Sequence, residues 1–209
     1  MRALGIEGAW VHEPQIFDDA RGSFHEWFRP DVLHASTGRS MSVAQANRSV
    51  SRRGVVRGIH YSAVPPGQAK YVTCVRGAVL DVVVDLRTGS PTFARWEAIV
   101  LDDRTPRSVF LAEGLGHGFA ALTDDATVVY LCSTPYVPER EHGIDPFDGD
   151  LAIRWPTGTG TVLSERDRRA PSLAEAHERG LLPRYAACTG PHRIDAPAAH
   201  VPADDEKAP

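Results

Sequence analysis

Residues 72–86 read Val-Thr-Cys-Val-Arg-Gly-Ala-Val-Leu-Asp-Val-Val-Val-Asp-Leu and carry the clearest secondary-structure signal in the chain. Their β-branched side chains predict strand, and Arg76-Gly77 divides them into two strands around a turn. Side chains of the second strand alternate between two faces, with Val79, Asp81, Val83 and Asp85 on one and Leu80, Val82, Val84 and Leu86 on the other. The middle of the chain is therefore predicted to be β-structure.

Similar short strands are predicted on both sides of this stretch, at residues 43–47, 94–101, 107–111 and 126–133. Turn residues separate them, as in Thr88-Gly89-Ser90-Pro91 and Thr123-Asp124-Asp125. Helix signals lie at the edges, in residues 30–36 and in residues 172–180, where Ser172 and Glu175 have capping-box spacing. Many short strands with little helix between them predict an all-β sandwich or barrel.

The composition narrows the class of protein. The 209 residues suffice for a well-packed core, and their formal net charge of −4 argues against a partner that is nucleic acid or an anionic membrane, and makes a phosphate-bearing ligand unexpected. The chain has no membrane-span-length apolar stretch and no signal-peptide core, so we predict a cytoplasmic protein. Cys74, Cys132 and Cys188 lack CxxC spacing, which predicts buried, reduced thiols.

The C-terminal end differs in composition from the rest. Residues 189–209 contain prolines, alanines and acidic residues, with only Ile194 and Val201 as large aliphatic side chains. Such a segment has too little apolar surface to pack. We therefore predict a single domain over residues 1–188 and a disordered tail over residues 189–209.

Residues 47–70 bring together side chains suited to chemistry, among them Arg57, His60 and Lys70. On a regular strand Arg57 and His60 would point in opposite directions, unless Gly58 marks a bulge that turns both toward one cavity. Taken alone, His60 could instead be a structural histidine or a surface histidine with no role in chemistry.

Two further segments are candidates. In residues 113–119, Gly116 and Gly118 flank His117; so much glycine is unlike a packed strand interior and indicates a close approach of the backbone, or else an ordinary turn. In residues 127–136, Tyr130 and Tyr136 are either core aromatics or hydroxyl proton donors, and the pattern alone favours the core.

Taken together, these segments resemble the dTDP-4-dehydrorhamnose 3,5-epimerase family, from about Gly5 to Tyr185. The landmarks that carry the resemblance stand in the family's order: Asp19-Ala-Arg21-Gly22-Ser-Phe24-His-Glu26-Trp-Phe28, Gln45-Ala-Asn47-Arg-Ser, Gly54-Val-Val-Arg57-Gly58-Ile-His60, Pro66-Gly67-Gln68-Ala-Lys70, Gly116-His117-Gly118-Phe119, Tyr130 to Tyr136, and Leu163-Ser164-Glu165-Arg166-Asp167. The resemblance implies a cupin-type jelly-roll β-barrel with a few short peripheral helices.

The resemblance also implies an activity: epimerisation of a dTDP-linked 4-keto-6-deoxyhexose at C3, C5 or both, in rhamnose or antibiotic-sugar biosynthesis, without a cofactor or metal. By position His60 is the base, Asp167 orients it, Lys70 stabilises the charge on the C4 oxygen, and Tyr130 returns the proton. Substrate-binding positions implied in the same way are Arg21, Phe24, Glu26, Gln45, Asn47, Arg57, His117, Tyr136 and Arg166. The first three are implied to come from a neighbouring subunit of a homodimer.

Three alternatives stay open. Ala46, Arg48 and Leu115 depart from the family's usual residues near the pocket, so inversion of C3 alone or C5 alone remains possible. A metal-dependent cupin is disfavoured because Ser62 stands where the second histidine of the metal pattern belongs. A non-catalytic sugar-nucleotide-binding cupin is disfavoured because the base, cation and donor are all present.

Overall fold

The computed structural model describes residues 1–156 and 160–188, so the predicted tail lies outside the described residues. The strands are β1 (Arg2–Ala3), β2 (Ala9–His12), β3 (Phe17–Asp19), β4 (Gly22–Phe24), β5 (Gln45–Ser51), β6 (Val56–Ser62), β7 (Lys70–Arg76), β8 (Ala78–Asp85), β9 (Trp96–Asp102), β10 (Ser108–Leu111), β11 (Leu115–Ala121), β12 (Ala126–Cys132) and β13 (Glu141–Gly143). The helices are α1 (Pro30–Thr37), the 3-10 turn η1 (Pro138–Arg140), α2 (Glu165–Arg168), α3 (Leu173–Glu178) and α4 (Tyr185–Cys188).

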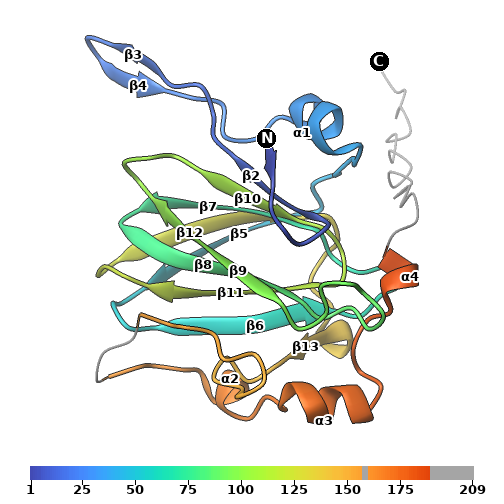
Figure 1. Ribbon diagram of the computed structural model, residues 1–209. Coiled ribbons are helices and arrows are strands. Elements are labelled where there is room, and N and C mark those ends of the chain that lie inside the picture. The colour runs from blue at the N-terminus through green and yellow to red at the C-terminus, as the bar shows by residue number, and fades with distance from the viewer. Residues whose placement is uncertain (157–159, 189–209) are drawn as a thin grey trace, which may run out of the picture.

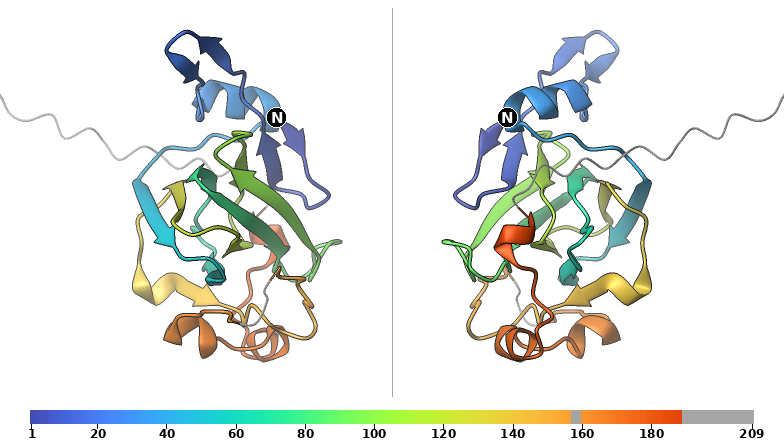
Figure 2. Two further views of the ribbon diagram at one scale, coloured as in Figure 1. Left: turned by 90° about the vertical axis from the view of Figure 1, so that its left-hand side faces the viewer. Right: turned by 90° about the vertical axis from the view of Figure 1, so that its right-hand side faces the viewer.

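Two antiparallel sheets pack face to face (Figure 1). One has six strands in the order β1-β2-β10-β7-β12-β5, and the other has five in the order β13-β6-β11-β8-β9. The ribbon β3-β4 forms a separate two-stranded sheet that projects away from both (Figure 2). The short helices lie at the periphery. The all-β, cupin-type fold predicted from the sequence is confirmed, whereas the division into a domain and a tail stays a prediction.

The central stretch forms the two predicted strands, β7 and β8, but they do not pair with each other. β7 lies in the six-stranded sheet and β8 in the five-stranded sheet, so the turn at Arg76-Gly77 carries the chain from one sheet to the other. The two faces of β8 are buried in different clusters. Val79 and Val83 pack between the sheets, while Val82 and Val84 pack against the C-terminal segment that covers the outside. This explains why β8 is apolar on both faces.

The glycine-rich segment around His117 corrects one expectation. Residues 115–121 form β11, which is buried along its whole length at the centre of the five-stranded sheet. A Cβ atom on Gly116 would lie 2.7 Å from Ile59 Cγ2, and one on Gly118 would lie 2.8 Å from the carbonyl oxygen of Arg57. The glycines therefore belong to a packed strand interior, because β6 crosses too close for a side chain. The predicted close approach of the backbone is confirmed.

The other secondary-structure expectations hold with shifted boundaries. The predicted strands near 43–47, 94–101, 107–111 and 126–133 correspond to β5, β9, β10 and β12. Ser172 caps α3, and Glu175 completes the capping box as predicted. The three cysteines are free and buried. Within the described residues, no helix is long and apolar enough to span a membrane.

Candidate active site

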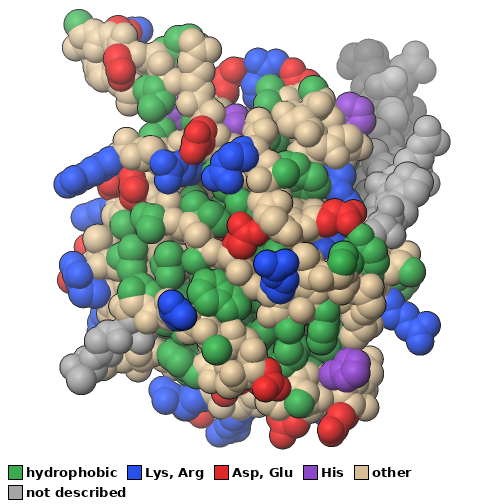
Figure 3. Space-filling model, in the orientation of Figure 1, with side chains coloured by type: hydrophobic (Ala, Val, Ile, Leu, Met, Phe, Trp, Pro, Cys, Tyr) green, Lys and Arg blue, Asp and Glu red, His purple; other side chains and the backbone are tan. Residues whose placement is uncertain are grey.

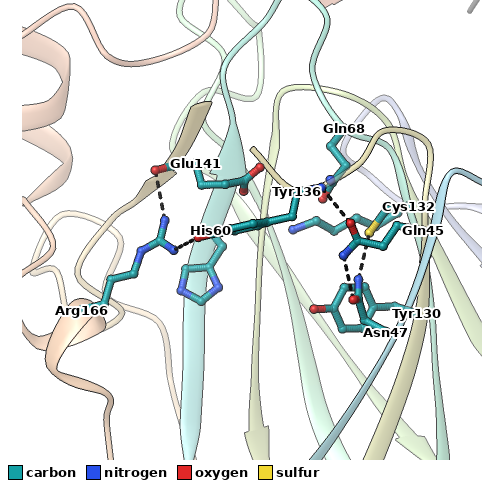
Figure 4. A pocket seen from close by; sticks show the side chains of 10 residues that line it. Gln45, Asn47, His60, Gln68, Tyr130, Cys132, Tyr136, Glu141 and Arg166 are labelled. Atoms are coloured by element: carbon teal, nitrogen blue, oxygen red, sulfur yellow. Dashed lines mark hydrogen bonds between the residues drawn. The ribbon is translucent and has the colours of Figure 1, made fainter. Parts of the chain in front are cut away.

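A cavity of about 300 Å³ opens among the strands that carry the predicted catalytic side chains. Its walls come from both sheets, from the segment after β12 and from α2 (Figure 4). The residues that line it are Gln45, Asn47, His60, Gln68, Lys70, Tyr130, Cys132, Tyr136, Glu141 and Arg166. Seven of the thirteen residues proposed from the sequence therefore share one cavity.

His60 and Asp167 make the contact expected of a base and its orienting carboxylate. Nε2 of His60 lies 2.6 Å from Oδ1 of Asp167, and the aspartate side chain is 5% exposed. Burial raises the pKa of Asp167, but hydrogen bonds with His60 and Ser164 outweigh burial and hold that pKa below its ordinary value. The ionised carboxylate can only accept, so Nε2 donates to it and Nδ1 of His60 keeps its lone pair. His60 thus has one nitrogen free to take a proton.

Local structure fixes this pair from both sides. Ser164 caps α2, and its hydroxyl accepts a hydrogen bond from the Asp167 backbone N–H at 3.0 Å. His60 follows an irregularity in β6, where the register against β11 shifts between His117 and Phe119. Gly58 lies at this irregularity with φ of 125°. The predicted bulge is confirmed, but of the two side chains it was expected to turn toward one cavity, only His60 lines the cavity.

Replacing Gly58 with alanine is expected to lower the free energy of unfolding by about 2 kcal/mol and to reduce activity. The added Cβ atom would lie 2.6 Å from Gly118 Cα, and the backbone already adopts a positive φ. Denaturant unfolding and initial rates would measure both effects. Gly149→Ala is the matched control because its Cβ atom would meet open space. Equal stability of the two variants would contradict this account of the bulge.

Lys70 and Tyr130 face the cavity from neighbouring strands, β7 and β12. Burial lowers the pKa of Lys70 and raises the pKa of Tyr130. The Tyr130 hydroxyl therefore keeps its proton at neutral pH, as a proton donor must. Tyr130 packs against the core but also lines the cavity, and Tyr136 is 50% exposed and lines it too. The sequence pattern that favoured core tyrosines was therefore wrong for Tyr136 and incomplete for Tyr130.

Polar side chains surround the mouth of the cavity. Gln45 Nε2 donates to Asn47 Oδ1 at 2.8 Å, and Gln45 Oε1 accepts from the backbone N–H of Tyr136 at 2.8 Å (Figure 4). Arg166 donates to Tyr136 Oη at 3.3 Å and to the carbonyl oxygen of Glu141 at 3.0 Å. These bonds tie β5, the segment after β12 and α2 together around the opening.

Besides Asp167, two predicted residues lie close by without lining the cavity. His117 Nε2 lies 2.7 Å from Oδ2 of the fully buried Asp81. His117 is opposite His60 in the pairing of β11 with β6. Arg57 is exposed, donates to Ser51 Oγ at 3.1 Å, and lies near enough to Tyr130 for its charge to oppose the rise in the pKa of Tyr130.

Arg21, Phe24 and Glu26 do not reach the cavity within this chain. Arg21 and Phe24 lie in the ribbon formed by β3 and β4, where their side chains are 90% and 64% exposed. Glu26 follows the ribbon and pairs with Arg29 at 3.2 Å. Figure 1 shows the ribbon projecting beyond the sheets, away from the end where α2 and α3 lie. The chain by itself therefore leaves three of the predicted binding residues apart from the other ten.

Three cavity residues were not among the sequence-predicted site residues: Gln68, Cys132 and Glu141. Gln68 and Cys132 stand within stretches already singled out, so proximity in sequence was an available signal. Glu141 follows a short 3-10 turn and enters the cavity only because β13 pairs with β6. No sequence pattern indicated that pairing.

The metal-dependent alternative would require a cluster of donor side chains. Across residues 1–156 and 160–188, no group of three His, Cys, Asp or Glu side chains is placed to hold a metal ion. In His60 and His117, one ring nitrogen already contacts a carboxylate.

Relatives of the chain are numerous and similar over most of its length. The family model described as dTDP-4-dehydrorhamnose 3,5-epimerase matches residues 3–175. A dTDP-4-dehydrorhamnose 3,5-epimerase of Streptomyces griseus is 57% identical over 188 residues, covering 90% of this chain and 94% of that protein.

Solved structures of similar proteins belong to the same kind of enzyme as these relatives. A 4-keto-6-deoxy sugar epimerase from the novobiocin gene cluster of Streptomyces spheroides has a TM-score of 0.87 and 59% identity, covering 90% of this chain and 94% of the other. A 3'-monoepimerase from Streptomyces bikiniensis, solved with dTDP-quinovose, has a TM-score of 0.87 and 56% identity with the same coverage.

The fold and the cavity, taken with these relatives, define an isomerase of the racemase and epimerase class. The chain belongs to the dTDP-4-dehydrorhamnose 3,5-epimerase family.

Proposed function

We propose that the protein inverts a dTDP-linked 4-keto-6-deoxyhexose at C3, C5 or both, using only its own side chains. The observation that carries this proposal is the cavity in which the His60 base, the Lys70 cation and the Tyr130 hydroxyl face one space. A carbonyl at C4 acidifies the C–H bonds on both neighbouring carbons, so base, charge stabiliser and acid suffice, and no cofactor or metal is needed.

The proposed reaction assigns each group one task. Nδ1 of His60 removes the proton, and the C–H electron pair moves to form an enolate whose charge lies on the C4 oxygen. Asp167 stabilises the resulting imidazolium, and Lys70 stabilises the enolate oxygen. Tyr130 then donates its proton to the opposite face of the same carbon. The phenolate recovers a proton from solvent, and His60 releases its proton to water.

The nucleotide end of the substrate is proposed to lie at the cavity mouth. Arg57 and Arg166 place positive charge near the opening, which suits a diphosphate in spite of the net negative chain. Gln45, Asn47 and Tyr136 offer amide and aromatic groups there, and His117 is proposed to support the sugar end. We further propose that the reaction takes place in the cytoplasm.

Arg21, Phe24 and Glu26 are proposed to complete the site of a second subunit in a homodimer. The support is their position on an exposed two-stranded ribbon, which has little stability by itself. Exchange of the two ribbons would bury Phe24 and give each site an arginine and an aromatic ring for the nucleotide.

Subunit complementation tests the shared site. A His60→Asn chain and an arm variant carrying Arg21→Gln, Phe24→Ala and Glu26→Gln are each expected to have little activity at low substrate concentration. Mixed dimers would hold one intact site, so reassociation of equal amounts is expected to restore about a quarter of wild-type activity. No recovery from mixed dimers demonstrated by sedimentation, or an active monomer, would contradict the exchange.

The epimerase reaction is tested by NMR in deuterium oxide with dTDP-4-keto-6-deoxyglucose. We expect deuterium to enter C3, C5 or both without added metal or nicotinamide. Exchange at one position identifies a mono-epimerase. Absence of exchange with folded protein would support the non-catalytic cupin instead, and loss of exchange on chelation would support the metal-dependent one.

Tyr130→Phe is expected to keep proton removal but to slow inversion by about 10²-fold. His60 would still exchange the proton on its own face, whereas the opposite face would lack its donor. Deuterium wash-in and product stereochemistry, followed in the same NMR sample, separate the two steps. Tyr185→Phe is the control, because Tyr185 does not line the cavity. Parallel loss of exchange and inversion in Tyr130→Phe would refute the assignment of Tyr130 as donor.

A further inference from the structure

Lys70 is half-buried and makes no ion pair among the described residues. Its side chain lines the cavity at the start of β7, and burial is the largest influence on its pKa, which it lowers. A lysine that loses its proton would present only a neutral amine to the enolate oxygen. The charge on Lys70 therefore has to be maintained by its surroundings.

Charged and titratable groups approach Lys70 from several elements. Those that face it or share its cavity are Asp81 on β8, Glu141 on β13, Cys132 and Tyr130 on β12, His60 on β6 and Arg166 on α2. Apart from burial, a Cys132 thiolate would raise the pKa of Lys70 the most, the Glu141 and Asp81 carboxylates raise it less, and Arg166 lowers it. Burial raises the pKa of the Cys132 thiol itself, so the thiol stays neutral near pH 7. The carboxylates are thus the groups available to carry the opposing charge.

Glu141 is held so that its carboxylate enters the cavity. Its strand pairs with β6, with Glu141 opposite Ser62, and its carbonyl oxygen accepts from Arg166 at 3.0 Å. In Figure 4 the Glu141 carbonyl oxygen points toward Arg166, whereas the Glu141 side chain points the other way, toward Tyr136. Within the described part of the chain, the Glu141 carboxylate makes no ion pair. It is therefore a free negative charge in the cavity that Lys70 also lines.

Asp81 approaches from the interior of the barrel. Its side chain is 0% exposed, and Oδ2 is engaged by His117. Oδ1 is buried and has no hydrogen-bond partner among the described residues. A buried, unpartnered carboxylate oxygen is costly unless a compensating positive charge lies near. Because the charge of Asp81 raises the pKa of Lys70, we assign the compensating charge to the Lys70 ammonium.

We propose that Glu141 and Asp81 together hold Lys70 in its ammonium form and thereby act as positioning residues for the cation that faces the C4 oxygen. The proposal rests on the proposed function for the role of Lys70 in the reaction. Glu141 lines the cavity and Asp81 is fully buried on β8, so the two carboxylates come from different strands of the five-stranded sheet.

The chain has only two lysines, Lys70 and Lys207, which makes a direct measurement simple. Protein labelled with ¹³C at lysine Cε should give two resonances, and Lys70→Met assigns them. Titration of the ligand-free protein then reports the charge of Lys70 independently of catalysis. We expect Glu141→Gln and Asp81→Asn each to lower the Lys70 midpoint by about one pH unit.

Three comparisons make the result decisive. Glu139→Gln removes the same charge from an exposed position two residues away and should leave the midpoint unchanged. Glu141→Asp keeps the charge, so its Lys70 midpoint should stay close to the wild-type value. If Asp81→Asn fails to fold, Glu141→Gln still tests the proposal, because Glu141 is half-buried and its substitution should be tolerated. An unchanged Lys70 midpoint in folded Glu141→Gln would overturn the proposal.

Kinetics then separates this proposal from the proposed function. If Lys70 must be charged during turnover, the alkaline limb of kcat/KM should move to lower pH in Glu141→Gln by the same amount as the NMR midpoint. A shifted midpoint with an unshifted alkaline limb would support the charge balance at Lys70 while overturning its role as the enolate-stabilising cation.

Discussion

Replacing His60 with asparagine is expected to lower the rate of deuterium entry at both C3 and C5 by about 10³-fold. Asparagine keeps a polar group of similar size near Asp167 but has no basic nitrogen. Because both carbons flank the same carbonyl and face the same base, neither exchange should survive. NMR in deuterium oxide, with thermal unfolding to verify the fold, measures the result.

His142→Asn is the matched control for this variant. His142 lies on β13, which pairs with β6, but its side chain packs beside Tyr61 rather than lining the catalytic cavity. Deuterium entry at C3 and C5 in the His142→Asn enzyme should remain close to the wild-type rate. If His60→Asn kept exchange at one carbon, a second base would have to serve that carbon, and the assignment of His60 to both positions would be wrong.

Replacing Lys70 with methionine is expected to lower kcat by about 10²–10³-fold. Methionine keeps a long apolar stem but removes the positive charge beside the developing enolate oxygen. Because the Lys70 ammonium is also the proposed compensating charge for Asp81, the variant is expected to lose some stability but to remain folded. Steady-state kinetics and thermal unfolding would measure the two effects separately.

The division between kcat and KM tests this role. A group that stabilises charge only in the transition state changes kcat, whereas one that merely holds the substrate changes KM. A Lys70→Met enzyme with normal kcat and raised KM would therefore make Lys70 a substrate-binding residue. Arg168→Met, on the exposed side of α2, controls for the loss of one positive charge.

The sequence predicted the local elements well because their signals are local. Alternation and β-branching located β7 and β8, and a serine with glutamate three residues later located the start of α3. The same reasoning failed for β11, where two glycines suggested an irregular segment. Glycine is required there because β6 passes too close for a side chain, and this contact joins residues about sixty positions apart in the sequence.

The site was predicted in part, for a similar reason. The match of residue types in the family's order identified His60, Lys70, Tyr130 and Asp167, and the structure brings the first three to one cavity with Asp167 in contact with His60. Glu141 carries no motif of its own and reaches the cavity through strand pairing. Under the proposed exchange of ribbons, Arg21 and Phe24 act in the site of a second chain, and no pattern within one chain displays such a contact.

Residues 72–86 separate what the sequence determines from what only the tertiary structure decides. From the sequence alone, residues 72–86 had to form two strands, because backbone preference and side-chain alternation act over a few residues. Only the tertiary structure decided that these strands enter opposite sheets, so that the charge of Asp81 on β8 acts on Lys70 from the other sheet. Burial, hydrogen bonding and charge balance are properties of groups distant in sequence, so they exist only once the chain has folded.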